Sequence, residues 1–235
     1  MPKIVAHRGY SSAFRENAIP AWAGAVKARA DVVEIDVRRS ADGAFVCAHD
    51  PDLRIAGHPG IISQMRVAEL ARISAGGEPA APLLHGAFST IPPSTAILFD
   101  VKDESPSALT DLHAFRQQFP DHRVIFGLHS LASVERMRGL GGAEILGFLG
   151  GEEAEDDHFF AAGGNILRIW EAAARPERIG KLRGQQREVW MTLGGPGTDR
   201  DVGDYIPEAL RSYHHAGFTG FLVNDPKSAR QALAG

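Results

Sequence analysis

Short apolar segments alternate with amphipathic segments along this chain, and this rhythm limits the folds that it can adopt. Runs rich in β-branched residues predict strands, and apolar residues spaced three and four apart predict helices. The expected strands span residues 3–6, 32–37, 96–101, 123–128, 144–149, 165–169, 188–193 and 219–223. The expected helices span residues 18–30, 66–73, 106–118, 131–139, 153–162, 176–183, 205–216 and 227–233. Eight strands that alternate with helices predict an α/β protein with a (β/α)8 TIM barrel fold.

A doubly wound open sheet is the alternative arrangement of the same elements. That fold usually carries a glycine fingerprint after its first strand, and no such pattern follows residues 3–6. The length of 235 residues and the hydrophobic content of 44% suit one barrel, so we expect residues 1–235 to form a single domain.

Residues 44–48 form an additional strand that breaks the alternation. A strong turn signal precedes them, in the order Ser40-Ala41-Asp42-Gly43. About seven residues separate Val37 from Phe45, whereas a parallel crossover needs a dozen or more. Residues 44–48 are therefore expected to return as a hairpin arm, which brings His49 back beside the strand at 32–37.

Two carboxylates lie at alternate positions of the apolar strand at 32–37. Side chains two residues apart on a strand share a face, so Glu34 and Asp36 point the same way. Burying two like charges without a counter-charge is costly. An edge strand with a solvated acidic face is one interpretation, and a divalent cation between the carboxylates is the interpretation that the apolar surroundings favour.

Further ionisable residues lie where the barrel strands end, which is where TIM barrels place their active sites. Asp100 and Lys102 share a face at the end of the strand at 96–101, and His7 and Arg8 follow the first strand. Glu34, Asp36 and Asp100 are candidate ligands for one divalent cation, Mg²⁺ or Ca²⁺. Arg8 and Lys102 are candidate contacts for an anion such as phosphate. His7 and His49 are a candidate general acid and base pair, because imidazole exchanges protons near neutral pH.

The bulk properties exclude several other classes of protein. A net charge of −4 disfavours a nucleic-acid binder, which usually has a basic surface. Cys47 is the only cysteine, so no internal disulfide forms, and we expect a reducing, cytoplasmic location. The N-terminus does not read as a signal peptide, and no apolar run approaches the roughly 20 residues of a membrane helix.

At these same residues the chain resembles the glycerophosphodiester phosphodiesterase family. The matching motifs are His7-Arg8-Gly9, Glu16-Asn17, Glu34-Ile35-Asp36-Val37, Asp42-Gly43, His49-Asp50, Asp100-Val101-Lys102, Val189-Trp190 and Asn224-Asp225-Pro226. The resemblance implies a metal-dependent barrel enzyme that hydrolyses glycerophosphodiesters to sn-glycerol 3-phosphate and an alcohol. It assigns acid–base catalysis to His7 and His49, the metal to Glu34, Asp36 and Asp100, and phosphate contacts to Arg8 and Lys102. It also implies that Glu16 is a site residue and that residues 38–65 form a small insertion.

Three positions depart from the family pattern, in which Asp100 is usually glutamate and Ala18 and Asn224 are usually threonine. Asn17 is expected to cap the helix at 18–30. Trp190 is a candidate substrate contact, with a place in the core as the alternative. We expect a small-molecule phosphodiester as the partner. The sequence leaves open the alcohol group, the metal, the oligomeric state, and whether water or a neighbouring substrate hydroxyl attacks.

Two other functions fit the same residues. One is a lysophospholipase D or phospholipase C-like activity on lipids, for which Ile61, Ile62 and Met65 would supply an apolar groove. The other is a catalytically silent barrel that binds phosphoesters, which Asp100 and the altered motif flanks suggest.

Overall fold

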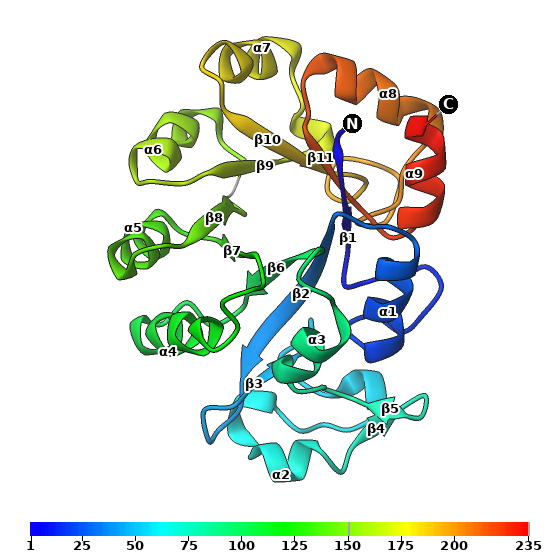
Figure 1. The fold of residues 1–235 in the computed structure, drawn as a ribbon, viewed down its shortest axis with the longest axis vertical. Helices are drawn as coiled ribbons and strands as arrows, with labels where there is room; N and C mark the ends of the chain where they lie inside the picture. Colours follow the sequence, from blue (N-terminus) through cyan, green and yellow to red (C-terminus); the bar gives the residue numbers. More distant parts are fainter. Residues whose placement is uncertain (150, 235) are drawn as a thin grey trace.

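The centre of the molecule is a closed barrel of parallel strands (Figure 1). The structure is a computed structural model that describes residues 1–149 and 151–234. The eight barrel strands are β1 (Lys3–Ala6), β2 (Val32–Arg39), β6 (Ala96–Val101), β7 (Val124–Leu128), β8 (Glu144–Gly147), β9 (Ile166–Trp170), β10 (Glu188–Thr192) and β11 (Gly220–Val223). Neighbours in this order pair in parallel, and β1 pairs with both β2 and β11, which closes the ring. The predicted TIM barrel is therefore confirmed, and the open sheet is excluded.

Helices surround the barrel, and one follows each strand (Figure 1). They are α1 (Ile19–Lys27), α3 (Leu84–Thr90), α4 (Pro106–Gln117), α5 (Leu131–Leu140), α6 (Asp156–Ala161), α7 (Pro176–Gly184), α8 (Pro207–Ala216) and α9 (Pro226–Ala234). Ser105 and Ser130 cap α4 and α5 by accepting hydrogen bonds from the backbone N–H groups of Ala108 and Ser133. None of the helices within the described residues is both long and apolar enough to cross a membrane.

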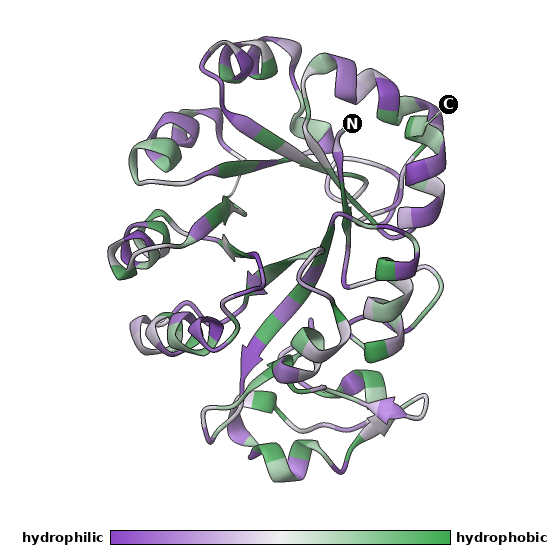
Figure 2. Ribbon diagram, viewed as in Figure 1, coloured by the Kyte–Doolittle hydropathy of each residue, from purple (hydrophilic) through white to green (hydrophobic). Residues whose placement is uncertain are grey.

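Alternation along the strands divides the apolar side chains between two cores. Val33, Ile35 and Phe99 point outward and join the large core between the strands and the helices. The opposite faces of the strands fill the barrel interior, with Val5, Val32, Ala96, Leu98, Ile125, Leu146, Phe148, Ile166, Trp190 and Leu222. Figure 2 shows long apolar stretches along the central strands, while the surrounding helices carry both polar and apolar residues. The face that carries Glu34 and Asp36 is the interior face of β2, so the solvated edge-strand interpretation is wrong.

An insertion follows β2 and lies to one side of the barrel, below α1 and α3 in Figure 1. Its first strand, β3 (Phe45–Cys47), pairs antiparallel with β2, so the predicted hairpin arm is confirmed. The insertion also holds η1 (Arg54–Ala56), η2 (Ile62–Gln64), α2 (Val67–Leu70), β4 (Ser74–Ala75) and β5 (Glu78–Pro79). A small core of its own links residues from Val46 to Ala81, and this core extends well past residue 65.

Candidate active site

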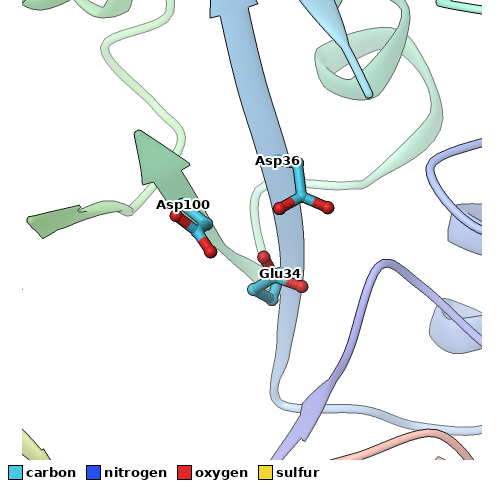
Figure 3. Close-up of side chains that lie close together, drawn as sticks. All are labelled: Glu34, Asp36 and Asp100. Carbon is cyan, nitrogen blue, oxygen red and sulfur yellow. The ribbon is translucent and has the colours of Figure 1, made fainter. Parts of the chain in front are cut away.

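Three carboxylates gather on the inner face of the barrel at the C-terminal ends of β2 and β6. Asp36 and Asp100 are direct neighbours in the parallel pairing of these strands, and Glu34 lies two residues before Asp36 on the same face. Each residue offers one oxygen, and these oxygens all lie within 4.8 Å of one another. Figure 3 shows the three side chains grouped over the two adjacent strands.

Two cations are packed against this acidic cluster. Lys102 Nζ lies 2.9 Å from Asp36 Oδ1 and 2.7 Å from Asp100 Oδ2. Arg8 Nε lies 3.2 Å from Asp36 Oδ2, and the Arg8 backbone N–H donates to Glu34 Oε2 at 2.7 Å. Burial would weaken these cations, but the charges of Asp36 and its neighbours outweigh it and raise the pKa of both Arg8 and Lys102. The structure thus brings all five predicted metal and phosphate residues into one cluster.

The charge balance of the cluster fits a bound cation. Burial, followed by the charges of Asp36 and Asp100, raises the pKa of Glu34 well above its usual range. Burial also acts to raise the pKa of Asp100, but the hydrogen bond from His129 and the charge of Lys102 lower it to about 2. Glu34 is therefore the carboxylate that the neighbouring cations do not fully neutralise. Three converging carboxylate oxygens are a donor set that suits a hard divalent cation.

Asn17 holds Asp36 in place, a role that the sequence analysis missed. Its Nδ2 donates to Asp36 Oδ2 at 2.7 Å, and its Oδ1 accepts the Asp36 backbone N–H at 3.1 Å. The expected helix cap is wrong, because Ala18 occupies the cap position of α1 without a side-chain hydrogen bond. Asn17 has a φ of 52°, in the left-handed region that asparagine tolerates better than most residues. The Glu16-Asn17 motif was the available signal, although it did not reveal this contact.

His7 is buried directly after β1, and its hydrogen-bond partner Asn224 determines its tautomer. The amide nitrogen of Asn224 donates to Val202 O at 2.8 Å and to Asp204 Oδ1 at 2.9 Å. The Asn224 Oδ1 must therefore accept, and it lies 2.8 Å from His7 Nδ1. This arrangement places the proton of neutral His7 on Nδ1 and leaves the lone pair on Nε2. Burial, followed by the charge of Arg8, lowers the pKa of His7 to about 4.

His49 follows the hairpin arm and is held through its backbone. Arg38 Nε donates to the carbonyl oxygens of Ala48 and His49, each at 3.1 Å. The imidazole Nδ1 lies 3.0 Å from Asp50 Oδ1, and the His49 side chain is 42% exposed. His49 and His7 both line the same cavity. The hairpin therefore places the second histidine at the barrel mouth, while Arg38 on β2 fixes the turn that carries it.

The remaining two predicted site residues lie in different environments. Glu16 accepts a hydrogen bond from Arg8 Nη1 at 2.6 Å, so it orients the guanidinium from behind. Trp190 is only 2% exposed, packs in the barrel interior, and donates from Nε1 to Glu188 at 2.9 Å. The structure does not bring Trp190 to the cavity, and Trp170 lines it instead. The reason is depth, because Trp190 lies in the middle of β10 whereas Trp170 is the last residue of β9.

A cavity of about 200 Å³ opens above the acidic cluster. Its lining residues are His7, Arg8, Glu34, His49, Asp100, Lys102, His129, Phe148, Arg168, Trp170, Thr192, Val202 and Leu222. His129 follows the fourth barrel strand, where the sequence suggests a substrate contact. Its Nε2 lies 2.8 Å from Asp100 Oδ1, and its ring stacks on Phe148 with centroids 5.3 Å apart. Arg168 was missed by the sequence analysis.

The fold and the site together define a TIM barrel whose mouth carries an acidic cluster that could hold a cation, flanked by two histidines and two basic residues. Residues 7–119 match the profile of the glycerophosphoryl diester phosphodiesterase family. This segment begins at His7, directly after β1, and it holds β2, β6 and the three carboxylates of the acidic cluster. The resemblance predicted from the sequence is therefore confirmed over residues 7–119.

Curated relatives and solved structures give similar matches. A probable glycerophosphodiester phosphodiesterase 1 from Mycobacterium tuberculosis is 43% identical over 76 residues, which cover 32% of this chain and 28% of the relative. A glycerophosphodiester phosphodiesterase from Bacillus altitudinis is 36% identical over 73 residues, 31% of this chain and 30% of the relative. The matched segments thus span less than a third of the length of these relatives.

Among solved structures, a glycerophosphodiester phosphodiesterase from Thermotoga maritima aligns with a TM-score of 0.78 at 21% identity, covering 100% of this chain and 99% of that one. A phosphodiesterase from Oleispira antarctica, solved with the product sn-glycerol-3-phosphate, aligns with a TM-score of 0.83 at 18% identity, covering 100% and 98%. At these identities the structural matches establish the barrel fold.

Proposed function

We propose that this protein is a metal-dependent phosphodiesterase that hydrolyses glycerophosphodiesters to sn-glycerol 3-phosphate and an alcohol. The observation that carries the proposal is the convergence of the buried His7, the half-buried His49 and the acidic cluster on one cavity. The match of residues 7–119 to the profile of the glycerophosphoryl diester phosphodiesterase family supports the same reaction. So does the sn-glycerol-3-phosphate bound to the Oleispira antarctica phosphodiesterase, whose fold this chain shares.

In this proposal His7 acts as the general base. With its proton on Nδ1 facing Asn224, the Nε2 lone pair is available to take a proton from the attacking hydroxyl. The lowered pKa of about 4 keeps His7 in the neutral form that a base requires at neutral pH. The attacking group is either water or a hydroxyl of the substrate's own glycerol, and the same atom of His7 serves both routes.

His49 acts as the general acid in this proposal. It reaches the cavity from the hairpin arm, on a different element from His7, so in this proposal one imidazole serves the attacking oxygen and the other serves the leaving oxygen. A proton given by His49 to the leaving alcohol oxygen would complete the cleavage. This separation of roles is what in-line displacement at phosphorus requires, with the attacking and leaving oxygens on opposite sides.

Arg8 and Lys102 hold the phosphate oxygens in this proposal. Arginine matches the geometry of two phosphate oxygens and lysine acts as a point charge. Glu34, Asp36 and Asp100 would hold one divalent cation, Mg²⁺ or Ca²⁺, which would neutralise the phosphate and polarise the attacking hydroxyl. Asp100 is one methylene shorter than the usual glutamate, and its hydrogen bond to His129 keeps it within the cluster.

The lipid-directed alternative has less support. Ile62 is 1% exposed and lies in the core of the insertion, and Met65 packs against that core. Of the three residues expected to form an apolar groove, Ile61 is the one that is exposed. A small, water-soluble diester is therefore the favoured substrate. We also propose a cytoplasmic location, which the single, buried, unpaired Cys47 supports.

The decisive experiment measures the release of glycerol 3-phosphate from a panel of glycerophosphodiesters. Each assay is run with Mg²⁺, with Ca²⁺ and with a chelator. Turnover that requires a divalent cation and yields glycerol 3-phosphate is the expected result. Turnover that is indifferent to the chelator would refute the assignment of the acidic cluster. Metal-replete protein that binds the diesters and releases no product would favour the silent binding barrel.

A further inference from the structure

Arg168 is a buried cation on the aromatic side of the barrel mouth, beside Phe148 and Trp170. It lies on β9, shares the inner face of the strand with Ile166 and Trp170, and borders the cavity. Its exposed fraction is 7%. Among the residues that the structure describes, none forms a hydrogen bond with its Nε or Nη1 atoms. Arg168 therefore differs from Arg8 and Lys102, whose charges are already matched by carboxylates.

Two aromatic rings hold the guanidinium in place. Its central carbon lies 4.1 Å from the ring centroid of Trp170 and 5.3 Å from that of Phe148. Gly127 makes room for this packing, because a Cβ atom there would lie 2.3 Å from the Phe148 ring. Cation–π contacts of this kind orient a guanidinium but do not satisfy its N–H donors. The two rings thus fix the side chain at the cavity, with Nε and Nη1 left without a hydrogen-bond partner among the described residues.

A buried, unpaired guanidinium is costly and needs a compensating charge. Asp100 is the carboxylate whose field reaches Arg168, but it already accepts from His129 and Lys102. The group that satisfies Arg168 must therefore arrive with a ligand. The phosphate that is cleaved belongs beside Arg8, Lys102 and the acidic cluster, so the part of the substrate that reaches Arg168 is another part.

The same geometry disfavours a cationic alcohol. A quaternary ammonium or ammonium group is usually held against aromatic faces, and here the guanidinium already occupies the faces of Phe148 and Trp170. A positive alcohol group would also be repelled by Arg168. A negative group would form charge-assisted hydrogen bonds in a site of low polarity, where such bonds are strong.

We propose that Arg168 forms an anion-binding subsite for the alcohol part of the substrate, so that the preferred glycerophosphodiesters carry a second negative charge on that alcohol. This inference rests on the proposed phosphodiesterase function and adds the substrate class to it. Diesters with choline or ethanolamine as the alcohol are expected to be the poorest substrates.

Two diesters that differ by this charge provide the test. Glycerophosphoglycerol carries only the reacting phosphate, and bis(glycerophospho)glycerol adds a second phosphodiester on the same glycerol alcohol. The wild-type protein should have a higher kcat/KM per diester on the second compound. Arg168→Met should lower kcat/KM on bis(glycerophospho)glycerol by about 10- to 100-fold more than on glycerophosphoglycerol. Arg168→Lys should recover part of the preference, because it restores the charge.

Arg175→Met is the matched control. It removes one positive charge from the chain just after the same strand, where the Arg175 side chain is 64% exposed and paired with Glu153. It should leave the preference intact. Equal losses on both compounds in Arg168→Met, or no preference in the wild type, would overturn the proposal while leaving phosphodiesterase activity standing.

A binding measurement tests the subsite at Arg168 independently of whether the protein hydrolyses diesters. Dissociation constants for both compounds are determined by calorimetry on His49→Ala and on His49→Ala/Arg168→Met, in the presence of Ca²⁺. The proposal expects about 10- to 100-fold weaker binding of bis(glycerophospho)glycerol in the double variant, and a much smaller change for glycerophosphoglycerol. Equal dissociation constants for the two compounds on His49→Ala would overturn it, even if no diester is ever turned over.

Discussion

The two sides of the barrel mouth are built on different principles. The side formed by β1, β2 and β6 is crowded with charges that satisfy one another, with Lys102 shared between Asp36 and Asp100. The side formed by β8 to β11 is largely apolar and aromatic. Phe148 and Trp170 lie around Arg168, whose Nε and Nη1 atoms have no hydrogen-bond partner in the described part of the chain. The charged residues of the first side, from His7 to Lys102, lie within the segment that matches the family profile, and the second side lies outside it.

This contrast suggests a division of labour between reaction and selection. Groups that take part in bond cleavage must keep fixed distances from one another and fixed protonation states, so a change in one group disturbs the others. Groups that select a substrate need only match the part of it that varies. The charged side is therefore expected to be intolerant of change, and the aromatic side to alter preference rather than reaction. The following predictions test that difference.

The largest effect is expected on the charged side, from His49→Ala. Loss of one general acid should lower kcat by about 10² to 10⁴-fold. The stability should hardly change, because the His49 side chain is 42% exposed and its position is set by backbone contacts to Arg38. His158→Ala, at an exposed histidine on α6, is the control and should keep full activity. A loss of less than tenfold in His49→Ala would mean that another group protonates the leaving alcohol.

How much of this contrast could be predicted from the sequence depends on the range of the interactions. Strand alternation is local, so it placed Glu34 and Asp36 on one face and Asp100 beside Lys102. The turn before residue 44 and the short connection predicted the hairpin, and so the return of His49. The eightfold rhythm predicted the barrel, which puts the ends of distant strands together.

The missed features depend on contacts between distant segments. Asn17 bonds to Asp36 across 19 positions, and Asn224 bonds to His7 across 217 positions. Neither pairing has a local pattern, although the Glu16-Asn17 motif and the departure at Asn224 marked the positions. Trp190 and Trp170 differ in their depth along their strands. The sequence does not fix where a strand ends closely enough to tell which of the two reaches the cavity. Arg168 appeared only as a polar residue within an apolar strand.

The burial of His7 should make the stability of the charged side depend on pH. The folded pKa of about 4 lies below the ordinary value of 6.5, so between these values the unfolded chain binds a proton that the folded protein does not. Stability should therefore fall as the pH is lowered through this range, by up to about 3 kcal/mol from this group. Urea unfolding at a series of pH values, with a metal chelator present, measures this change in the free energy of unfolding. In His7→Asn the free energy of unfolding should depend less steeply on pH, by a slope that corresponds to up to one proton. If wild type and variant show the same slope, His7 is not buried as described.

Asn17→Ala should weaken the charged side without removing any charge. Both hydrogen bonds to Asp36 are lost, and groups that orient metal ligands are typically worth about 10- to 100-fold in metal affinity. Calorimetric titration with Ca²⁺ or Mg²⁺ measures this. Asn17→Gly is the matched variant, because glycine accepts the φ of 52° without strain. If Asn17→Gly binds the metal as tightly as the wild type, the loss in Asn17→Ala comes from backbone strain and not from the missing amide.

The smallest effect is expected where the two sides meet, at Gly127. This residue is the strand neighbour of Asp100, and a Cβ atom there would lie 2.3 Å from the Phe148 ring and 2.7 Å from the Phe99 carbonyl oxygen. Backbone cannot yield as a side chain can, so Gly127→Ala should lower the free energy of unfolding by about 1 to 3 kcal/mol. Gly139→Ala, at an exposed helical glycine where an added Cβ would meet none of the described atoms within 4 Å, should instead gain about 0.5 to 1 kcal/mol. If both variants stabilise the protein in urea unfolding, Phe148 moves freely, and the aromatic side is not the fixed wall on which the orientation of Arg168 depends.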